Sequence, residues 1–235
     1  ITTEINDRDA KNALDRATMA LDDADLMVIS DYGKGALPLP LLGQIIAAAK
    51  AKGKHVIADP KREDVSAYEN VDLLTPNLKE LKAIAAMQLS NIDEIGKAAT
   101  ALAKTHGFGS ILTTLSARGM ILSRPDGKQF HDPASARDVF DVAGAVVTVV
   151  AMLAAALAAG AGLEGAVKVA NHAAGVAVGK SGTAIVAPGE LLAHVVSAPP
   201  KTDWPNIATQ CASWRNAGQK VAFANGCFDL LHPGH

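Results

Sequence analysis

The stretch LMVISDYGKGALPLPLLGQIIAAAKAKGKHVIAD, residues 26–59, decides the fold class. Its two ends, Leu26–Ser30 and His55–Ala58, are short apolar runs of the kind that form buried strands. Between them, Leu39–Lys52 has the composition of a helix that stops at Gly53. Because a strand, a helix and a second strand in this order form a parallel βαβ unit, the sequence predicts an α/β protein with a mostly parallel sheet and helices on both faces.

The same alternation continues toward the C-terminus. Apolar runs predict more strands, and Ala-rich stretches predict more helices. A turn at Pro125-Asp126-Gly127 between two short runs predicts a hairpin at a sheet edge. The further elements expected are a strand at Val71–Thr75, a helix from Asn77 to about Met87, a helix at Ile92–His106, a strand at Ser110–Leu115, hairpin strands at Met120–Ser123 and Lys128–His131, and helices at about 144–160 and 163–180.

Three regions are expected along the chain. Residues 1–196 carry the alternation and are predicted to form one domain. Residues 197–205 contain paired prolines among polar residues, which favours an extended linker. Residues 206–235 would begin a second domain, with a helix at about Asn206–Ala217 and a strand at Lys220–Ala224.

The composition indicates a folded protein that acts on small molecules. The 235 residues are 49% hydrophobic and 20% charged, and the formal net charge is -2, so nothing suggests a nucleic-acid or membrane partner. The two cysteines lack the spacing of a disulfide framework or a zinc site, which fits a cytoplasmic protein. The uncharged run at 142–163 is long enough for a membrane span, but its Ala and Gly content favours a buried helix.

Asn77 and Glu80 stand one helical turn apart, directly after a predicted strand. Open α/β sheets bind ligands at the carboxyl ends of their strands, so this pair suits a phosphate group or a hydrated magnesium ion. The same spacing is that of a capping box, in which the two side chains only satisfy free N–H groups of the helix. Both interpretations stay open at this point.

Small residues open the long Ala-rich helix at Gly144 and Ala145, shortly after Asp141. Free backbone N–H groups at a helix N-terminus attract anions, and small side chains let a phosphoryl group approach them. Ordinary packing of small residues is the alternative.

Taken together, these motifs resemble the PfkB family of sugar kinases over about residues 20–192. The matching segments stand in the family's order, and the first two are similar to the S-D-Y-x-K-G and D-P-K of heptose kinases. They are Ser30–Gly35, Asp59–Lys61, Thr75–Glu80, Thr113–Met120 and Asn171–Thr183. The resemblance implies the C-terminal half of a ribokinase-like three-layer sandwich that transfers phosphate from ATP.

The resemblance also implies roles for single residues. The residues expected to bind nucleotide and phosphate are Asn77, Leu78, Lys79, Glu80, Thr114, Gly144, Ala145 and Asn171. Glu80 would help to hold Mg²⁺, and Asp141 would lie near a monovalent cation.

Two valines depart from the family's pattern. Aligning the signature D-x-x-G-A-G-D on Asp141 puts Val146 at its last glycine and Val147 at the catalytic aspartate. Because valine cannot accept a proton from the sugar hydroxyl, and loss of a general base costs a factor of about 10²–10⁴ in rate, low kinase activity is expected.

The C-terminal residues resemble a second family. They match the N-G-x-F-D-x-x-H-x-G-H opening of cytidylyltransferase-type nucleotidyltransferases through Asn225, Gly226, Phe228, Asp229, His232 and His235. The resemblance implies that the two histidines neutralise nucleotide phosphates as charge builds on the leaving group.

Both resemblances together imply a sugar kinase fused to an adenylyltransferase. The expected reactions are ATP-dependent phosphorylation of D-glycero-D-manno-heptose 7-phosphate at C1 and synthesis of ADP-heptose for lipopolysaccharide core. The chain is expected to be a fragment of such an enzyme, with activity impaired by truncation as well as by loss of the catalytic aspartate. Alternatives are an inactive nucleotide-binding remnant and a PfkB kinase of another sugar. An exposed sheet edge would favour pairing with a second copy as a homodimer.

Overall fold

The computed structural model describes residues 4–134, 145–180, 185–197, 204–216, 218 and 220–221. Within these ranges six strands form one sheet in the order β1-β2-β3-β4-β5-β6, which is also their order in the sequence. The strands are β1 (Leu26–Ser30), β2 (His55–Asp59), β3 (Leu73–Leu74), β4 (Ile111–Thr114), β5 (Met120–Ser123) and β6 (Gln129–Asp132).

The sheet is mixed. Strands β1 to β4 run parallel, whereas β5 and β6 are antiparallel to their neighbours. The parallel strands all end at one edge of the sheet, where Ser30 stands opposite Asp59 in the register of β1 and β2. This carboxyl edge is where open α/β sheets bind their ligands.

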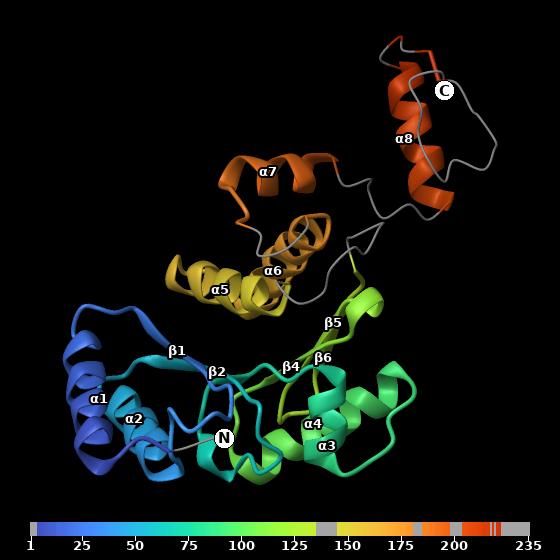
Figure 1. Cartoon of the computed structure of the whole chain (residues 1–235). Coiled ribbons are helices and arrows are strands. Elements are labelled where there is room, and N and C mark those ends of the chain that lie inside the picture. The colour runs from blue at the N-terminus through green and yellow to red at the C-terminus, as the bar shows by residue number, and fades with distance from the viewer. Residues whose placement is uncertain are drawn as a thin grey trace. The chain divides into compact units, whose positions relative to one another are not determined.

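Helices cover both faces of the sheet (Figure 1). A core of buried residues from β1 to β5 and α2 to α4 fills one face, with partly buried residues of α1 packed against it, and α5 and α6 close the other face. The helices of this unit are α1 (Asp7–Ala20), α2 (Leu39–Ala51), α3 (Leu78–Ala85), α4 (Ile92–His106), α5 (Ala145–Ala158), α6 (Leu163–Val178) and α7 (Pro188–Ser197). The three-layer α/β fold predicted from the sequence is therefore confirmed.

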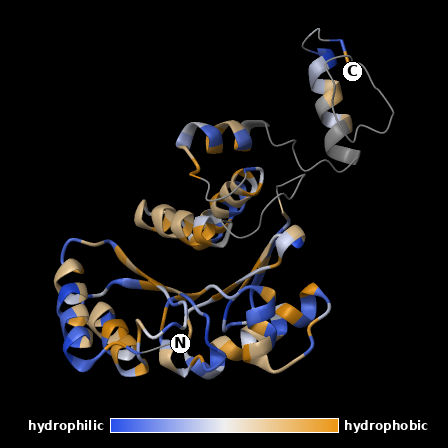
Figure 2. Ribbon diagram, in the orientation of Figure 1, coloured by the Kyte–Doolittle hydropathy of each residue, from blue (hydrophilic) through white to orange (hydrophobic). Residues whose placement is uncertain are grey.

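Within the apolar run at 142–163, the residues Ala145–Ala158 form a core helix, α5. Val149, Val150 and Leu153 of α5 are buried against Ile57 and Leu73 of the sheet. Figure 2 shows α5 apolar over most of its length, whereas α1 is largely hydrophilic. None of the helices in the described ranges is long and apolar enough to cross a membrane.

Two helices were not expected from the sequence. Helix α1 is rich in charged residues and buries none of its side chains fully. It is capped by Asn6, whose side chain accepts a hydrogen bond from the Asp9 amide. Helix α7 begins at Pro188, a residue that suits the first turn of a helix.

Contacts between Cα atoms divide the chain into residues 1–195 and residues 196–235. The main described element of the second unit is α8 (Trp204–Asn216), which begins and ends within two residues of the helix expected there. The strand expected at Lys220–Ala224 and the motif at Asn225–His235 lie outside the described residues, apart from Lys220 and Val221.

Candidate active site at the carboxyl edge of the sheet

Asn77 and Glu80 form the capping box that their spacing predicts. The Asn77 side chain accepts a hydrogen bond from the Glu80 amide at 2.9 Å, and Glu80 Oε2 accepts one from the Asn77 amide at 2.9 Å. These two bonds fix the start of α3 next to the end of β3. The capping box uses only one carboxylate oxygen of Glu80, Oε2, so Oε1 is available to other partners.

The second oxygen of Glu80 faces the loop after β2. Lys61 Nζ donates to Glu80 Oε1 at 2.6 Å and lies 3.8 Å from Asp59 Oδ2. Lys61 is about one-third exposed, whereas Asp59 is buried with 5% of its surface accessible. The other oxygen of Asp59, Oδ1, has no hydrogen-bond partner among the described residues.

Burial and charge shift the pKa values of this group. Burial raises the pKa of Asp59 to about 6, and the negative charge of Glu80 adds to that rise while Lys61 opposes it. Burial alone would lower the pKa of Lys61, but its hydrogen bond to Glu80 and the charge of Asp59 outweigh burial and raise it. The edge of the sheet therefore holds two carboxylates that share one ammonium group.

A second aspartate, Asp31, follows β1 at the same edge and is fully engaged. Its Oδ2 accepts hydrogen bonds from Arg62 Nε at 2.7 Å and from the Tyr68 hydroxyl at 2.6 Å, and its Oδ1 accepts one from the Gly33 amide at 2.8 Å. Arg62 also donates to the Leu37 carbonyl. This network ties the loop after β2 to the loop after β1.

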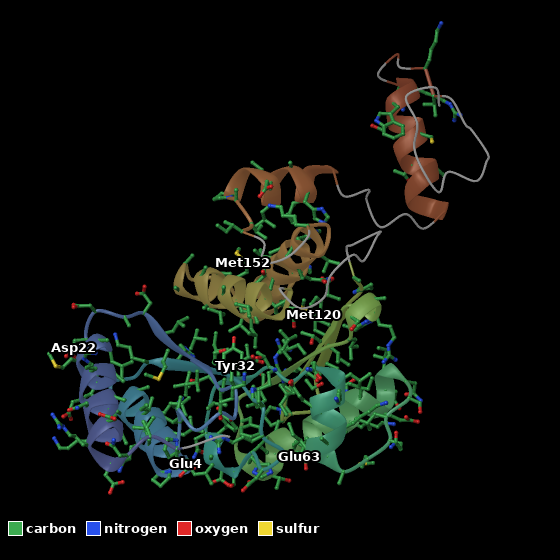
Figure 3. The ribbon with its side chains drawn as sticks, in the orientation of Figure 1. Glu4, Asp22, Tyr32, Glu63, Met120 and Met152 are labelled. Carbon is green, nitrogen blue, oxygen red and sulfur yellow. The ribbon has the colours of Figure 1, made fainter. Side chains whose placement is uncertain are left out.

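Figure 3 marks the loop after β1 with Tyr32 and the loop after β2 with Glu63. The Tyr32 side chain is 59% exposed, beside the buried Asp31. A Cβ atom on the neighbouring Gly33 would lie 3.8 Å from the Lys61 Cβ, so the two loops touch. The polar residues of both loops therefore contribute to one continuous edge.

Thr114 ends β4 beside the same cap. It pairs with Asn77 in an isolated parallel bridge, and its amide donates to the Pro76 carbonyl at 3.2 Å. Leu78 is half-buried behind the cap and Lys79 is exposed beside it. The structure therefore brings together five of the predicted nucleotide- and phosphate-binding residues: Asn77, Leu78, Lys79, Glu80 and Thr114.

Asn171 lies on α6 and contacts the end of β6. Its amide nitrogen donates to Asp132 Oδ2 at 2.6 Å and to the Pro133 carbonyl at 2.8 Å. Gly119 approaches the same backbone closely, because a Cβ atom there would lie 2.0 Å from the Asp132 carbonyl oxygen. The segment that leaves β6 toward residues 135–144 is therefore held from two sides, and the predicted role of Asn171 in nucleotide binding stays a prediction.

The predicted anion hole is only partly described. Ala145 begins α5, and Val147, at the position of the family's catalytic aspartate, is 55% exposed. Asp141 and Gly144 lie outside the described residues.

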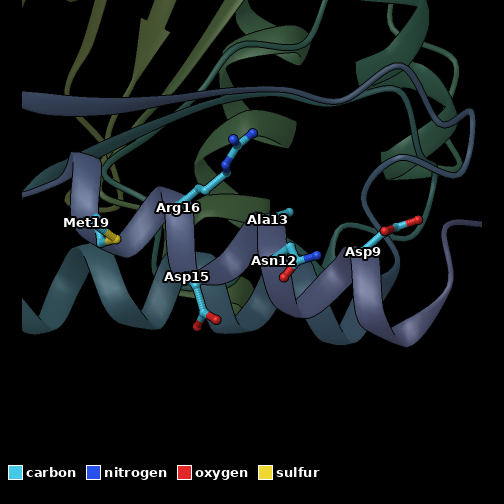
Figure 4. A pocket seen from close by; sticks show the side chains of 6 residues that line it. All are labelled: Asp9, Asn12, Ala13, Asp15, Arg16 and Met19. Atoms are coloured by element: carbon cyan, nitrogen blue, oxygen red, sulfur yellow. The ribbon is translucent and has the colours of Figure 1, made fainter.

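A shallow groove on the surface lies along α1 (Figure 4). Its lining residues come from this one helix, and Asp15 and Arg16 point in different directions. The groove contains none of the residues that the sequence singles out. Its lining residues are Asp9, Asn12, Ala13, Asp15, Arg16 and Met19.

Sequence reasoning assigned Glu80 to the magnesium site but gave no role to Asp59 or Lys61. Both stand in the Asp59-Pro60-Lys61 motif that carried the family resemblance. A signal was available, because an aspartate that ends a predicted buried strand lies at the ligand-binding edge of a parallel sheet. Its pairing with Glu80 depends on how the two loops fold and could not be derived from spacing.

Comparison with known proteins gives matches to carbohydrate kinases. The model of the pfkB family of carbohydrate kinases matches residues 2–189. The protein named bifunctional protein HldE from Paramagnetospirillum magneticum is 46% identical over 228 residues, which cover 94% of this chain and 47% of that protein. The HldE of Halorhodospira halophila is 45% identical over 92% of this chain and 46% of its own length. The chain thus spans about half the length of these relatives.

Solved structures of sugar kinases share the fold. Phosphofructokinase-2 from Escherichia coli, in complex with potassium, superposes with a TM-score of 0.72 at 23% identity, covering 82% of this chain and 63% of that one. Ribokinase from Arabidopsis thaliana, complexed with ribose and ATP, gives a TM-score of 0.67 at 22% identity, covering 82% and 60%. At this identity the likeness establishes the ribokinase-like fold alone.

Proposed function

Because the chain belongs to the pfkB family of carbohydrate kinases, we propose that its carboxyl edge is the ATP and Mg²⁺ site of a heptose kinase with low turnover. The chemistry is transfer of the γ-phosphoryl group of ATP to the C1 hydroxyl of D-glycero-D-manno-heptose 7-phosphate. The bond between that phosphorus and the ADP oxygen breaks, a bond to the sugar oxygen forms, and the hydroxyl proton leaves to a base.

One observation carries the proposal. The capping box holds Glu80 so that Oε2 serves the helix while Oε1 faces Lys61 at the edge where ligands bind. A magnesium ion bound through one or two carboxylates and substrate phosphates needs such an oxygen, and it retains several waters. Glu80 would hold Mg²⁺ directly or through water, and the start of α3 at Asn77 would favour the phosphate charge.

The low turnover follows from Val147. Phosphoryl transfer depends mostly on positioning and charge stabilisation, with one carboxylate taking the proton of the acceptor hydroxyl. Val147 has no group that can take it, and Val146 adds a β-branched side chain where the family has glycine. Nucleotide binding with turnover near background is therefore the expected behaviour, and an inactive remnant would differ only in having no turnover.

The relatives carry the word bifunctional in their names, and the motif at Asn225–His235 supports an adenylyltransferase as the second function. In that reaction His232 and His235 would stabilise the charge on the leaving pyrophosphate as ADP-heptose forms. Both substrates are small and anionic, which fits a cytoplasmic enzyme, and the position of β1 at the end of the sheet formed by the described residues favours a homodimer.

Calorimetry with Mg²⁺-ATP tests the binding part of the proposal. Glu80→Gln removes the charge of Oε1 and is expected to weaken binding at least tenfold. Glu94→Gln is the matched control, because Glu94 occupies the same N3 position in the cap that Asn91 gives α4. Equal affinity in both variants, or no binding by the unchanged chain, would contradict the proposed site.

A turnover assay with heptose 7-phosphate and ATP tests the catalytic part. The unchanged chain is expected to transfer phosphate at a rate near background. Val146→Gly combined with Val147→Asp restores the residues of the family's signature and is expected to raise the rate by about 10²-fold or more. Robust turnover by the unchanged chain would show that Val147 is no defect.

A further inference from the structure

The pair of carboxylates at Asp59 and Glu80 has a feature that the proposed kinase site does not use. Asp59 is buried, yet its Oδ1 has no hydrogen-bond partner among the described residues. An unpaired buried carboxylate oxygen is costly, so such an atom points to a ligand that is bound in the working state. Its nearest cation, Lys61, lies 3.8 Å from the other oxygen and is hydrogen-bonded to Glu80 instead.

The three side chains differ in how firmly they are held. Asp59 ends strand β2 and is 5% exposed, so its position is set by the sheet. Glu80 is fixed by the bond between its Oε2 and the Asn77 amide. Lys61 lies on a loop, is 30% exposed and has four rotatable side-chain bonds, so it is the member that can move aside.

We propose that Lys61 is a resident counter-ion of the Asp59–Glu80 pair, and that a divalent cation of the Mg²⁺ class binds both carboxylates by displacing it. The inference deepens the proposed function, because it concerns the same Glu80. In the metal-free protein the Lys61 ammonium neutralises part of the paired negative charge and keeps the site closed. The metal takes over that role, and the released ammonium becomes available to an anion such as a nucleotide phosphate.

The donor set suits this cation. Carboxylate oxygens and water are the ligands that Mg²⁺ prefers, and one or two protein carboxylates are enough when phosphates and waters complete the shell. Among the described residues no three His, Cys, Asp or Glu side chains cluster to form a richer site. Because an ammonium group and a divalent cation would repel each other between the same oxygens, their binding is expected to be mutually exclusive.

Manganese binding without nucleotide tests the inference, since Mn²⁺ is detected directly by electron paramagnetic resonance. Lys61→Met removes the competing ammonium and keeps much of the side chain's length. It is expected to tighten Mn²⁺ binding at least tenfold relative to the unchanged chain. Lys61→Arg, which keeps the charge, is expected to bind Mn²⁺ no more tightly than the unchanged chain, and Asp59→Asn at least tenfold more weakly.

Lys97→Met is the matched control. Lys97 forms an equally short ion pair with Asp93 at 2.6 Å, but both residues are exposed on α4. The same loss of one positive charge there is expected to leave Mn²⁺ affinity within twofold. Thermal unfolding gives a second measurement, in which Mn²⁺ is expected to raise the midpoint of Lys61→Met more than that of the unchanged chain.

The inference is overturned if Lys61→Met binds Mn²⁺ equally or more weakly, or if no variant binds it. If Lys61→Met does not fold, Lys61→Gln replaces it with the same expectation. Failure here is distinguishable from failure of the kinase proposal, because the titration contains neither nucleotide nor sugar. Tight Mg²⁺-ATP binding together with an unchanged Mn²⁺ affinity in Lys61→Met would reject the counter-ion role of Lys61 alone. Tighter Mn²⁺ binding by Lys61→Met, with no Mg²⁺-ATP binding by the unchanged chain, would reject the kinase proposal alone.

Discussion

Asp31 and Asp59 lie side by side at the ends of β1 and β2, and they behave in opposite ways. The Asp31 amide donates to the Asp59 carbonyl at 3.2 Å, and both side chains are buried, at 3% and 5% exposure. Asp31 accepts three hydrogen bonds, one of them from a guanidinium group. Asp59 has a single cation at 3.8 Å and one oxygen without a hydrogen-bond partner among the described residues.

The pKa values of the two carboxyl groups express this difference. Burial raises the pKa of Asp31, but the hydrogen bonds from Arg62, Tyr68 and Gly33 outweigh burial and hold it below its ordinary value. Burial raises the pKa of Asp59 to about 6. Residue type, burial and position in the sheet are thus insufficient to predict the direction of the pKa shift of such an aspartate, because the donors around the carboxylate decide it.

The largest expected effect comes from removing the carboxylate of Asp31, which accepts three hydrogen bonds. Asp31→Ala leaves the Arg62 guanidinium and the Tyr68 hydroxyl without their acceptor, so the free energy of unfolding is expected to fall by about 3–5 kcal/mol. Urea denaturation at pH 7 measures it. Asp22→Ala is the control, because Asp22 also forms an ion pair, with Lys52, but is 69% exposed, and a loss below about 1 kcal/mol is expected there.

The same variant has a defined pH dependence. The pKa of Asp31 is lower in the folded protein than in the unfolded chain, so its contribution is complete above the unfolded value of 3.8 and disappears as the pH falls through the folded value. The stability difference between the unchanged chain and Asp31→Ala is therefore expected to shrink below about pH 4. A difference that is constant down to pH 2 would contradict the ion-pair explanation.

Asp59→Asn is expected to change stability in the other direction. The folded pKa of about 6 lies above the ordinary value of 3.8 in the unfolded chain, so ionised Asp59 destabilises the fold progressively as the pH rises from about 4 to about 6. Removing the charge is expected to stabilise the protein by up to about 3 kcal/mol at pH 7. Urea denaturation with a chelator present measures this gain, which should vanish near pH 4.

Asp31→Asn provides the sharpest contrast to that gain. The substitution makes the same chemical change as Asp59→Asn, at the end of the neighbouring strand. Here, however, the charge that is lost is paired with Arg62. It is expected to destabilise the protein at pH 7. If both Asn variants shifted stability in the same direction, the difference between the two aspartates would not lie in their donors.

Much of the fold was predictable because the sequence patterns are local. The hydrophobic runs at β1 and β2 and the cap at Asn77 mark elements that the structure contains within a few residues of the expected bounds. Strand β3 is shorter than the run Val71–Thr75 because only Leu73 and Leu74 pair in the ladder with β2, and of these Leu74 alone also pairs with β4. Helix α1 escaped prediction because it contributes only partly buried residues to the core.

The site was predictable only in part. The spacing of Asn77 and Glu80 within one helical turn predicted either a capping box or a site for phosphate or magnesium. The structure contains the capping box, and Glu80 Oε1 still faces the edge of the sheet. The contacts of Glu80 with Lys61 and of Asp31 with Arg62 span 19 and 31 residues. Pairings of this length depend on how two loops cross the same edge, which periodicity and composition do not encode.

A third buried aspartate, Asp132, accepts a hydrogen bond from an uncharged donor. It tests whether the loss of such a donor lowers stability less than the loss of the Asp31 ion pair. Asp132 ends β6 at 5% exposure and accepts a 2.6 Å hydrogen bond from the Asn171 amide. Asn171→Ala removes this donor from a buried carboxylate, so a loss of about 1–3 kcal/mol is expected in urea denaturation. Asn12→Ala, on the exposed face of α1, is the control and should stay within about 0.5 kcal/mol.

The smaller expected loss has a physical reason and a further readout. An amide donor stabilises a carboxylate less than a guanidinium does, because the hydrogen bond lacks the charge on the donor. Asn171 also bonds the Pro133 carbonyl, so its loss should speed hydrogen exchange of the backbone that leaves β6. A loss as large as that of Asp31→Ala would mean that burial of the aspartate, rather than the charge of its donor, sets the energy at all three strand ends.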